Sequence, residues 1–237
     1  MKTQISPELL EEGPAVSLPM LILFLLAILV GSLVAAVLLP LLLPDLTSTV
    51  LGDQPTVFWM LSRGTAMVAF GLLWMSLAMG LLITNRLARA WPGGPAAFDL
   101  HQYLSILGLG FALAHGTVLL GDRFMNYSLV QILVPFATQA YRPLWVGLGQ
   151  IAFYIWGILV LSFYVRRQIG NSTWRLVHYA SFVSFLMALV HGLASGTNSG
   201  ELWAKDMYWA AGGLLLFLLI YRLLVTATRR VKPATAR

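Results

Sequence analysis

The chain has 237 residues, of which 59% are hydrophobic and only 10% are charged, whereas soluble domains carry about 25% charged residues; this composition indicates an integral membrane protein. The absence of cysteine excludes disulfides, thiolate metal sites and iron–sulfur clusters. The net charge of +6 does not indicate nucleic-acid binding, because the basic residues flank the apolar runs and therefore bear on membrane topology.

Six apolar runs are long enough to cross a bilayer, which takes about 20 helical residues. We predict, in chain order, spans over Leu18–Leu43, Val57–Thr84, Leu100–Leu120, Leu144–Val165, Trp174–Ala194 and Met207–Thr226. Pro40 and Pro44 are expected to close the first span. The predicted fold is all-α, an integral membrane bundle of six transmembrane helices. Residues 1–17 are expected to be a cytoplasmic N-terminal segment, residues 18–226 the membrane domain and residues 227–237 a basic cytoplasmic tail.

The basic residues predict how the bundle is oriented. Eleven of the fifteen Lys and Arg residues fall on one side of the predicted spans and four on the other. Short loops rich in Lys and Arg stay in the cytoplasm. We therefore expect a multi-pass protein of the cell membrane, surrounded by the lipid bilayer, with both termini in the cytoplasm.

All four histidines of the chain lie in two of the predicted spans, His101 with His115 and His178 with His191. Their separations of 14 and 13 residues correspond to about 21 Å and about 20 Å along a helix. His101 and His178 are thus expected near the cytoplasmic side, and His115 and His191 near the outer side. Ionisable side chains inside a membrane are usually functional and partnered. Two histidines at each depth predict two b-type haems, each ligated by one histidine from each span.

The fifth span presents a geometric difficulty for this prediction. Fourteen steps of about 100° return nearly to the same helix face, whereas thirteen steps fall about 140° short of four turns. His178 and His191 can serve two stacked haems only if the helix is overwound or kinked, or if the two rings tilt differently.

Three further residues are candidate haem contacts. Gly108 lies seven residues from both His101 and His115, where a missing side chain would let a porphyrin approach; close helix packing is the other common use of such a glycine. Arg175, three residues before His178, is placed to pair an inner propionate. Arg63, at the outer start of the second span, is placed to pair an outer one. Both arginines also suit simple anchoring at the membrane interface.

A cofactor-free protein is the alternative class. Histidines also form hydrogen bonds between membrane helices or relay protons in transporters. Such sites often include acidic residues, and no Asp or Glu lies deep in any predicted span. Four histidines in matched pairs therefore favour haem over a transporter or structural membrane protein.

At these positions the chain resembles the ferric reductase-like transmembrane domain. That family includes ferric reductases, the membrane part of NADPH oxidases and the bacterial haem subunit that serves a periplasmic methionine sulfoxide reductase. The resemblance covers about residues 58–219. It is carried by Asp-Leu-His101 with His115 fourteen residues on, and by Trp174-Arg175-Leu-Val-His178 with His191 thirteen residues on. It implies a six-helix bundle that carries electrons across the membrane between two b haems held by these four histidines.

Two departures qualify what the resemblance implies. The large members continue into a flavin and NADPH domain, whereas here eleven residues follow Thr226 and no glycine-rich nucleotide motif is present in a soluble context. The oxidases have a further histidine where this chain has Leu119, so the resemblance does not imply superoxide production. It does extend to Arg63, which aligns with an outer-side arginine of their second helix.

The expected function is therefore a transmembrane bis-haem b cytochrome, an oxidoreductase component that needs a separate electron donor. Three donors are expected as alternatives. The first is a separate flavoprotein reductase, the second is FMN or FAD bound by the bundle or by a partner, and the third is a quinol. The acceptor outside is expected to be a small molecule or a protein, and a quinol-linked haem subunit of an extracytoplasmic reductase is the nearest alternative. The loop from Gly121 to Pro143 is expected to cover the outer haem, to dock a partner or simply to join two helices.

Overall fold

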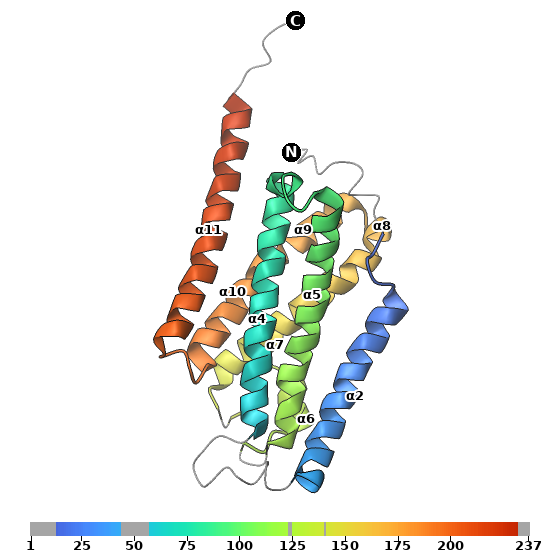
Figure 1. Cartoon of the computed structure of the whole chain (residues 1–237), viewed down its shortest axis with the longest axis vertical. Helices are drawn as coiled ribbons and strands as arrows, with labels where there is room; N and C mark the ends of the chain where they lie inside the picture. Colours follow the sequence, from blue (N-terminus) through green and yellow to red (C-terminus); the bar gives the residue numbers. More distant parts are fainter. Residues whose placement is uncertain (1–12, 44–56, 123–124, 140, 232–237) are drawn as a thin grey trace, which may run out of the picture.

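The computed structural model describes residues 13–43, 57–122, 125–139 and 141–231, and within these ranges the chain is helical, with no strand. In this part of the chain, six helical spans are long and apolar enough to cross a membrane. They are α2 (Leu18–Leu42), α4 (Val57–Thr84), α5 (Gly94–Thr117) with the short helix η2 (Val118–Gly121), α7 (Pro143–Tyr164), α9 (Asn171–His178) with α10 (Ala180–Ser195), and α11 (Leu202–Val231). These helices run up and down one bundle (Figure 1), which confirms the predicted fold class.

The predicted spans match these helices in number and order, and they differ at some ends. The third span begins at Gly94 instead of Leu100 and the sixth at Leu202 instead of Met207. The prediction that Pro40 closes the first span is wrong, because α2 continues through Pro40 to Leu42. Proline removes only its own N–H and disturbs the preceding turn, so the chain after it can remain helical. Pro44 lies outside the described residues.

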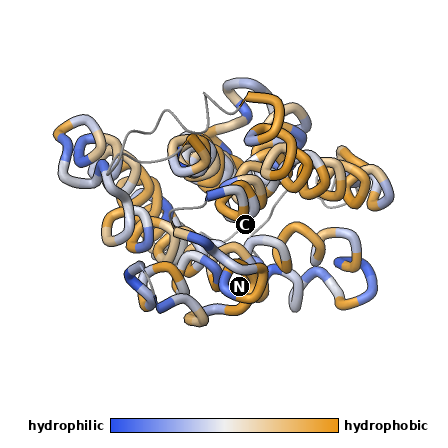
Figure 2. Tube along the Cα trace, turned by 90° about the horizontal axis from the view of Figure 1, so that it is seen from below, coloured by the Kyte–Doolittle hydropathy of each residue, from blue (hydrophilic) through white to orange (hydrophobic). Residues whose placement is uncertain are grey.

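The outer surface of the bundle is apolar over most of its length. Large side chains are widely exposed, among them Leu41 at 69%, Leu176 at 72% and Trp209 at 80%. Viewed along the bundle, hydrophobic residues occur all round the helices and not on one stripe only (Figure 2). Exposed apolar patches of this extent are rare on soluble monomers, whereas lipid covers them without cost. The surface is that of a multi-pass membrane protein.

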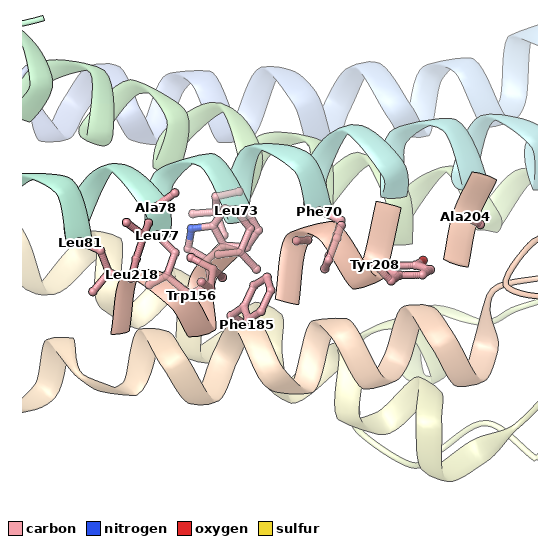
Figure 3. Close-up of a cluster of buried hydrophobic side chains, with 13 residues drawn as sticks. Phe70, Leu73, Leu77, Ala78, Leu81, Trp156, Phe185, Ala204, Tyr208 and Leu218 are labelled. Carbon is pink, nitrogen blue, oxygen red and sulfur yellow. The ribbon is translucent and has the colours of Figure 1, made fainter. Parts of the chain in front are cut away.

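The interior is organised around two antiparallel helix pairs. α4 packs along α5, and α7 packs along α10, while α2 covers the outer side of α5. A buried apolar cluster fills the middle of the bundle between α4, α7, α10 and α11; its members include Phe70, Leu73, Leu77, Trp156, Phe185 and Tyr208. Trp156 and Phe185 lie between the ribbons of α4 and α10 (Figure 3). This cluster separates the two ends of the bundle.

The described residues before α2 contact the bundle. The amide of Ala15 donates to Oε1 of Gln102 at 3.0 Å, and the hydroxyl of Tyr164 donates to the carbonyl of Val16 at 2.8 Å. α11 extends to Val231, so the beginning of the predicted basic tail is helical. Residues 1–12 and 232–237 of the predicted terminal segments lie outside the described part of the chain.

Candidate functional site

The four histidines lie inside the bundle as two pairs. The ring centroids of His101 and His178 are 6.0 Å apart, and those of His115 and His191 are 6.1 Å apart. In each pair α5 supplies one ring, and the second comes from α9 or α10. These are the pairs that the matched depths in the sequence predict.

The spacing within each pair fits a single metal ion between two imidazoles. With metal–nitrogen bonds of about 2.0–2.1 Å, two imidazoles on opposite sides of one ion have ring centres roughly 6 Å apart. The interplanar angles of 71° and 67° place the rings nearly perpendicular to each other in both pairs. The two pairs are therefore alike in both distance and orientation.

A break in the fifth span explains how His178 and His191 both face inward. α9 ends at His178 and α10 begins at Ala180, with Tyr179 between them. The Tyr179 amide donates to the Leu176 carbonyl and the Phe182 amide to the Tyr179 carbonyl, both at 3.2 Å. These are bonds to the third preceding residue, typical of a tighter helix with about 120° per residue. Local overwinding, one of the alternatives raised by the thirteen-residue spacing, therefore occurs at Tyr179.

Three of the four rings are held through Nδ1 by a backbone carbonyl. His101 donates to the carbonyl of Ser76 at 2.8 Å, His115 to that of Ser62 at 2.9 Å and His191 to that of Trp145 at 2.9 Å. A carbonyl oxygen can only accept, so Nδ1 carries the proton in these rings. The lone pair of Nε2 is then available to a metal, the usual arrangement of metal-ligating histidine.

The hydroxyls of Ser62 and Ser76 add a second contact to two of these rings. Ser62 Oγ lies 2.9 Å from His115 Nδ1 and donates to the His115 carbonyl at 2.9 Å. Ser76 Oγ lies 3.1 Å from His101 Nδ1 and 3.4 Å from the His101 carbonyl. Sequence reasoning missed both serines. Their spacing of 14 residues on α4, equal to that of the two histidines on α5, was the signal for them.

Two glycines lie beside the held rings. Gly80 and Gly149 each follow, by four positions, the residue whose carbonyl accepts from the histidine, Ser76 or Trp145. A Cβ on Gly149 would lie 2.6 Å from Nδ1 of His191, and one on Gly80 would lie 3.4 Å from Cε1 of His101. The missing side chain at Gly149 lets the His191 imidazole lie against the backbone of α7, where it reaches the Trp145 carbonyl, whereas a Cβ at Gly80 would make an ordinary van der Waals contact with His101. These glycines were also missed from the sequence.

His178 differs from the other three histidines. Its Nδ1 is buried and has no hydrogen-bond partner among the described residues. Its ring instead stacks on the indole of Trp174, with centroids 4.9 Å apart and planes 29° apart. The edge of that indole packs against Phe163 at 6.0 Å. His178 is thus positioned by aromatic contacts where the others are positioned by hydrogen bonds.

Each histidine pair faces its own cavity, and the two cavities are nearly equal in volume, about 250 Å³ for His115 with His191 and about 240 Å³ for His101 with His178. We name them the His115 cavity and the His101 cavity. Arg63 lines the His115 cavity, and Arg175 lines the His101 cavity, each at the end where the sequence places it. Arg222 also lines the His101 cavity and was not predicted, because the sequence does not show that the end of α11 reaches this cavity.

Gly108 has a different neighbour from the one predicted. A Cβ at this position would lie 2.6 Å from the Trp156 indole and 3.0 Å from Cβ of Leu72. Trp156 thus fills the space in which a porphyrin was expected to approach, and Gly108 does not line either cavity. The residue instead serves close packing, the alternative use of a membrane glycine. By admitting Trp156, which lines both cavities, it helps to form the wall between them.

The loop after α5 covers one side of the His115 cavity. Its short helix α6 (Leu129–Leu133) begins with a capping box formed by Ser128 and Gln131. Nε2 of Gln150 on α7 donates to the carbonyls of Gln131 and Ile132 at 2.7 and 2.8 Å. Gln131, Ile132 and Leu133 line the cavity. The loop thus contributes to the wall of the cavity, while its roles in covering a haem or docking a partner stay predictions; residues 123, 124 and 140 of the loop lie outside the described residues.

Comparisons of the chain with models of protein families, with characterised proteins and with solved structures find no match. The chemistry of the four histidine rings, and of the residues that hold them, therefore carries the functional inference.

Proposed function

We propose that the chain is a transmembrane cytochrome of the ferric reductase-like type that holds one b-type haem in each cavity and passes electrons across the membrane. The observation that carries this proposal is the pairing of four histidine rings at two levels, with centroids 6.0 and 6.1 Å apart. A bound haem supplies one-electron redox chemistry, while the protein supplies ligation, spacing and environment. The fixed Nδ1 protons of three rings support ligation through Nε2.

The residues around the histidines have distinct tasks in this proposal. His101 with His178 would hold one haem, and His115 with His191 would hold the other. The carbonyls of Ser62, Ser76 and Trp145 fix the ring orientation. The guanidinium groups that line the cavities suit carboxylates, because arginine pairs them with two parallel hydrogen bonds; these groups belong to Arg63, Arg175 and Arg222. The apolar cluster around Trp156 excludes water between the two levels.

The direction of transfer follows from the charges. With both termini in the cytoplasm, the His101 cavity faces the cytoplasmic donor and the His115 cavity faces the outside. Eleven of fifteen basic residues then lie on the cytoplasmic side. The donor in this proposal is a separate flavoprotein reductase or a quinol, and the acceptor is a small molecule or protein outside the cell membrane. A reporter fused to the C-terminus that proves extracytoplasmic would reverse the direction.

The purified chain, saturated with haem, is expected to bind two haems per polypeptide, both low-spin. Each cavity offers two imidazoles at metal-bridging distance, and two strong-field nitrogen ligands give low-spin iron. Pyridine haemochrome analysis measures the ratio, and electron paramagnetic resonance of the oxidised protein measures the spin state. A ratio near zero would reject the cytochrome. A ratio near one would reject the second site, with the His101–His178 pair the first suspect because His178 is the less firmly held ring.

NADPH alone is expected to leave the haem-loaded protein oxidised, whereas a flavin reductase with NADPH, or a quinol, should reduce it. The physical reason is that no glycine-rich nucleotide motif occurs outside the predicted membrane spans. Stopped-flow absorption in the haem α band follows the reaction, with boiled reductase as control. Rapid reduction by NADPH without an added protein would refute the separate donor.

A further inference from the structure

We propose that the two haem sites are built with unequal reduction potentials, the His101–His178 site having the higher one, because His178 lacks the carbonyl partner that orients the other three rings. This inference rests on the proposed function and concerns how the chain tunes its two sites. It follows from the backbone carbonyl acceptor on Nδ1, which His101, His115 and His191 have and His178 lacks.

A carbonyl acceptor on Nδ1–H makes an imidazole a stronger donor to the metal through Nε2. Stronger donation stabilises the oxidised metal and lowers its reduction potential, which is one of the ways in which a protein tunes haem. Both rings of the His115–His191 site have such an acceptor, at 2.9 Å in each case. In the other site only His101 has one, at 2.8 Å. The site with one held ring therefore keeps the higher potential.

The helix opposite His178 shows why its ring is not held. On α7 the carbonyl of Trp145 and the gap at Gly149 receive His191. Fourteen residues on, close to four turns and thus on nearly the same face, the corresponding positions are Leu159 and Phe163. A phenyl ring occupies the position that corresponds to the glycine, and it packs against Trp174 at 6.0 Å.

The corresponding carbonyl does not distinguish the two levels. The Leu159 carbonyl accepts from the buried hydroxyl of Ser162 at 2.7 Å, just as the Ser62 carbonyl, which holds His115, accepts from Thr65 at 2.9 Å. The gap beside the carbonyl is therefore the part of the holding arrangement that is replaced at the level of His178. The difference between the two sites is a feature of the α7 sequence and not of a single ring orientation.

The charges that line the cavities act in the same direction. Arg175 and Arg222 line the His101 cavity, whereas Arg63 is the arginine of the His115 cavity. No Asp or Glu occurs among the described residues that line either cavity. Positive charge near a redox centre favours the reduced state, since reduction adds an electron. Among the described residues, two guanidinium groups against one thus add to the difference that His178 produces.

Spectroelectrochemistry of the full-length protein loaded with haem tests the inference through the Ser62→Ala and Ser76→Ala variants. Both leave the ligands and the backbone carbonyls in place, but each removes a hydroxyl near one Nδ1, at 2.9 Å from His115 or 3.1 Å from His101. We expect two redox transitions in the unmodified protein, with midpoint potentials at least about 59 mV apart. For a one-electron couple this difference corresponds to a tenfold difference in the ratio of reduced to oxidised haem. Ser62→Ala should raise the lower transition only, and Ser76→Ala the higher one only.

Thr226→Ala is the matched control, because this hydroxyl donates to a backbone carbonyl of its own helix, that of Arg222, and Thr226 lines neither cavity; both transitions should stay in place. Two coincident transitions, or a Ser62→Ala shift of the higher one, would overturn the inference while leaving a two-haem cytochrome intact. Failure to bind haem would instead overturn the proposed function. If the serine variants lose haem, His115→Ala gives the second measurement: the single remaining transition should be the higher one, and retention of the lower one would reject the inference.

Discussion

Replacing His115 or His191 by alanine is expected to halve the haem content and leave the haem at His101 and His178 unchanged, while replacing His101 or His178 should have the converse effect. The two rings of each pair lie 6.0 or 6.1 Å apart, so each variant removes one of two axial ligands from one site only. The cluster around Trp156 separates the sites, which limits the effect on the other level. Haem quantitation and electron paramagnetic resonance of the four variants measure the outcome.

Double variants sharpen this test. His115→Ala combined with His191→Ala should retain one haem, as each single change does, because both changes affect one site. His101→Ala combined with His191→Ala should retain none. If this second pair kept one haem and the first pair kept none, the ligands would pair across the two levels, and the pairing seen in the structure would be contradicted.

Gly149→Ala is expected to remove the haem bound at His115 and His191, although it adds only one methyl group. A Cβ on Gly149 would lie 2.6 Å from Nδ1 of His191 and 2.7 Å from its Cγ, well inside van der Waals contact. The ring must then move away from α7 and lose the Trp145 carbonyl at 2.9 Å. Haem content should fall from two to about one per chain, with the potential of the remaining haem unchanged.

Gly157→Ala is the matched control for this change. It lies on the same helix, and a Cβ there would meet nothing within 4 Å. Alanine is favoured over glycine in a helix interior by about 0.8–1.0 kcal/mol, so this variant should fold at least as well and keep both haems. If Gly149→Ala also kept both haems, with unchanged potentials, the role of the glycine in seating His191 would be refuted.

The sequence predicts the spans because hydropathy over about 20 residues is a property of one helix by itself. The depth of each histidine is likewise local, since it follows from a rise of 1.5 Å per residue. The pairs His101–His178 and His115–His191 could therefore be expected from spacing alone. The thirteen-residue misfit shows that the fifth span must be irregular, but not that Tyr179 is the residue where it tightens.

The residues that hold and separate the sites depend instead on how neighbouring helices are aligned. Ser62 meets His115, and Gly149 meets His191, only because of the relative shift and rotation of packed helices, which the periodicity of one helix does not specify. Gly108 illustrates the same limit. Its seven-residue spacing from the histidines places it on their side of α5, yet a side chain from α7, Trp156, takes the adjacent space.

The stacking of the two histidine levels along α5 makes charge transfer between them sensitive to voltage. The fourteen residues from His101 to His115 span about 21 Å, roughly two thirds of a hydrocarbon core about 30 Å thick. One elementary charge crossing 100 mV changes in energy by about 2.3 kcal/mol. At that voltage, moving an electron between the two histidine levels would change its energy by about 1.5 kcal/mol, which is about a tenfold change in the equilibrium constant for electron transfer between the two haems. In the proposed orientation, a membrane that is negative inside drives electrons outward. The resting potential would thereby offset an unfavourable order of the two haem potentials, and steady turnover would tend to depolarise the cell unless other ions moved.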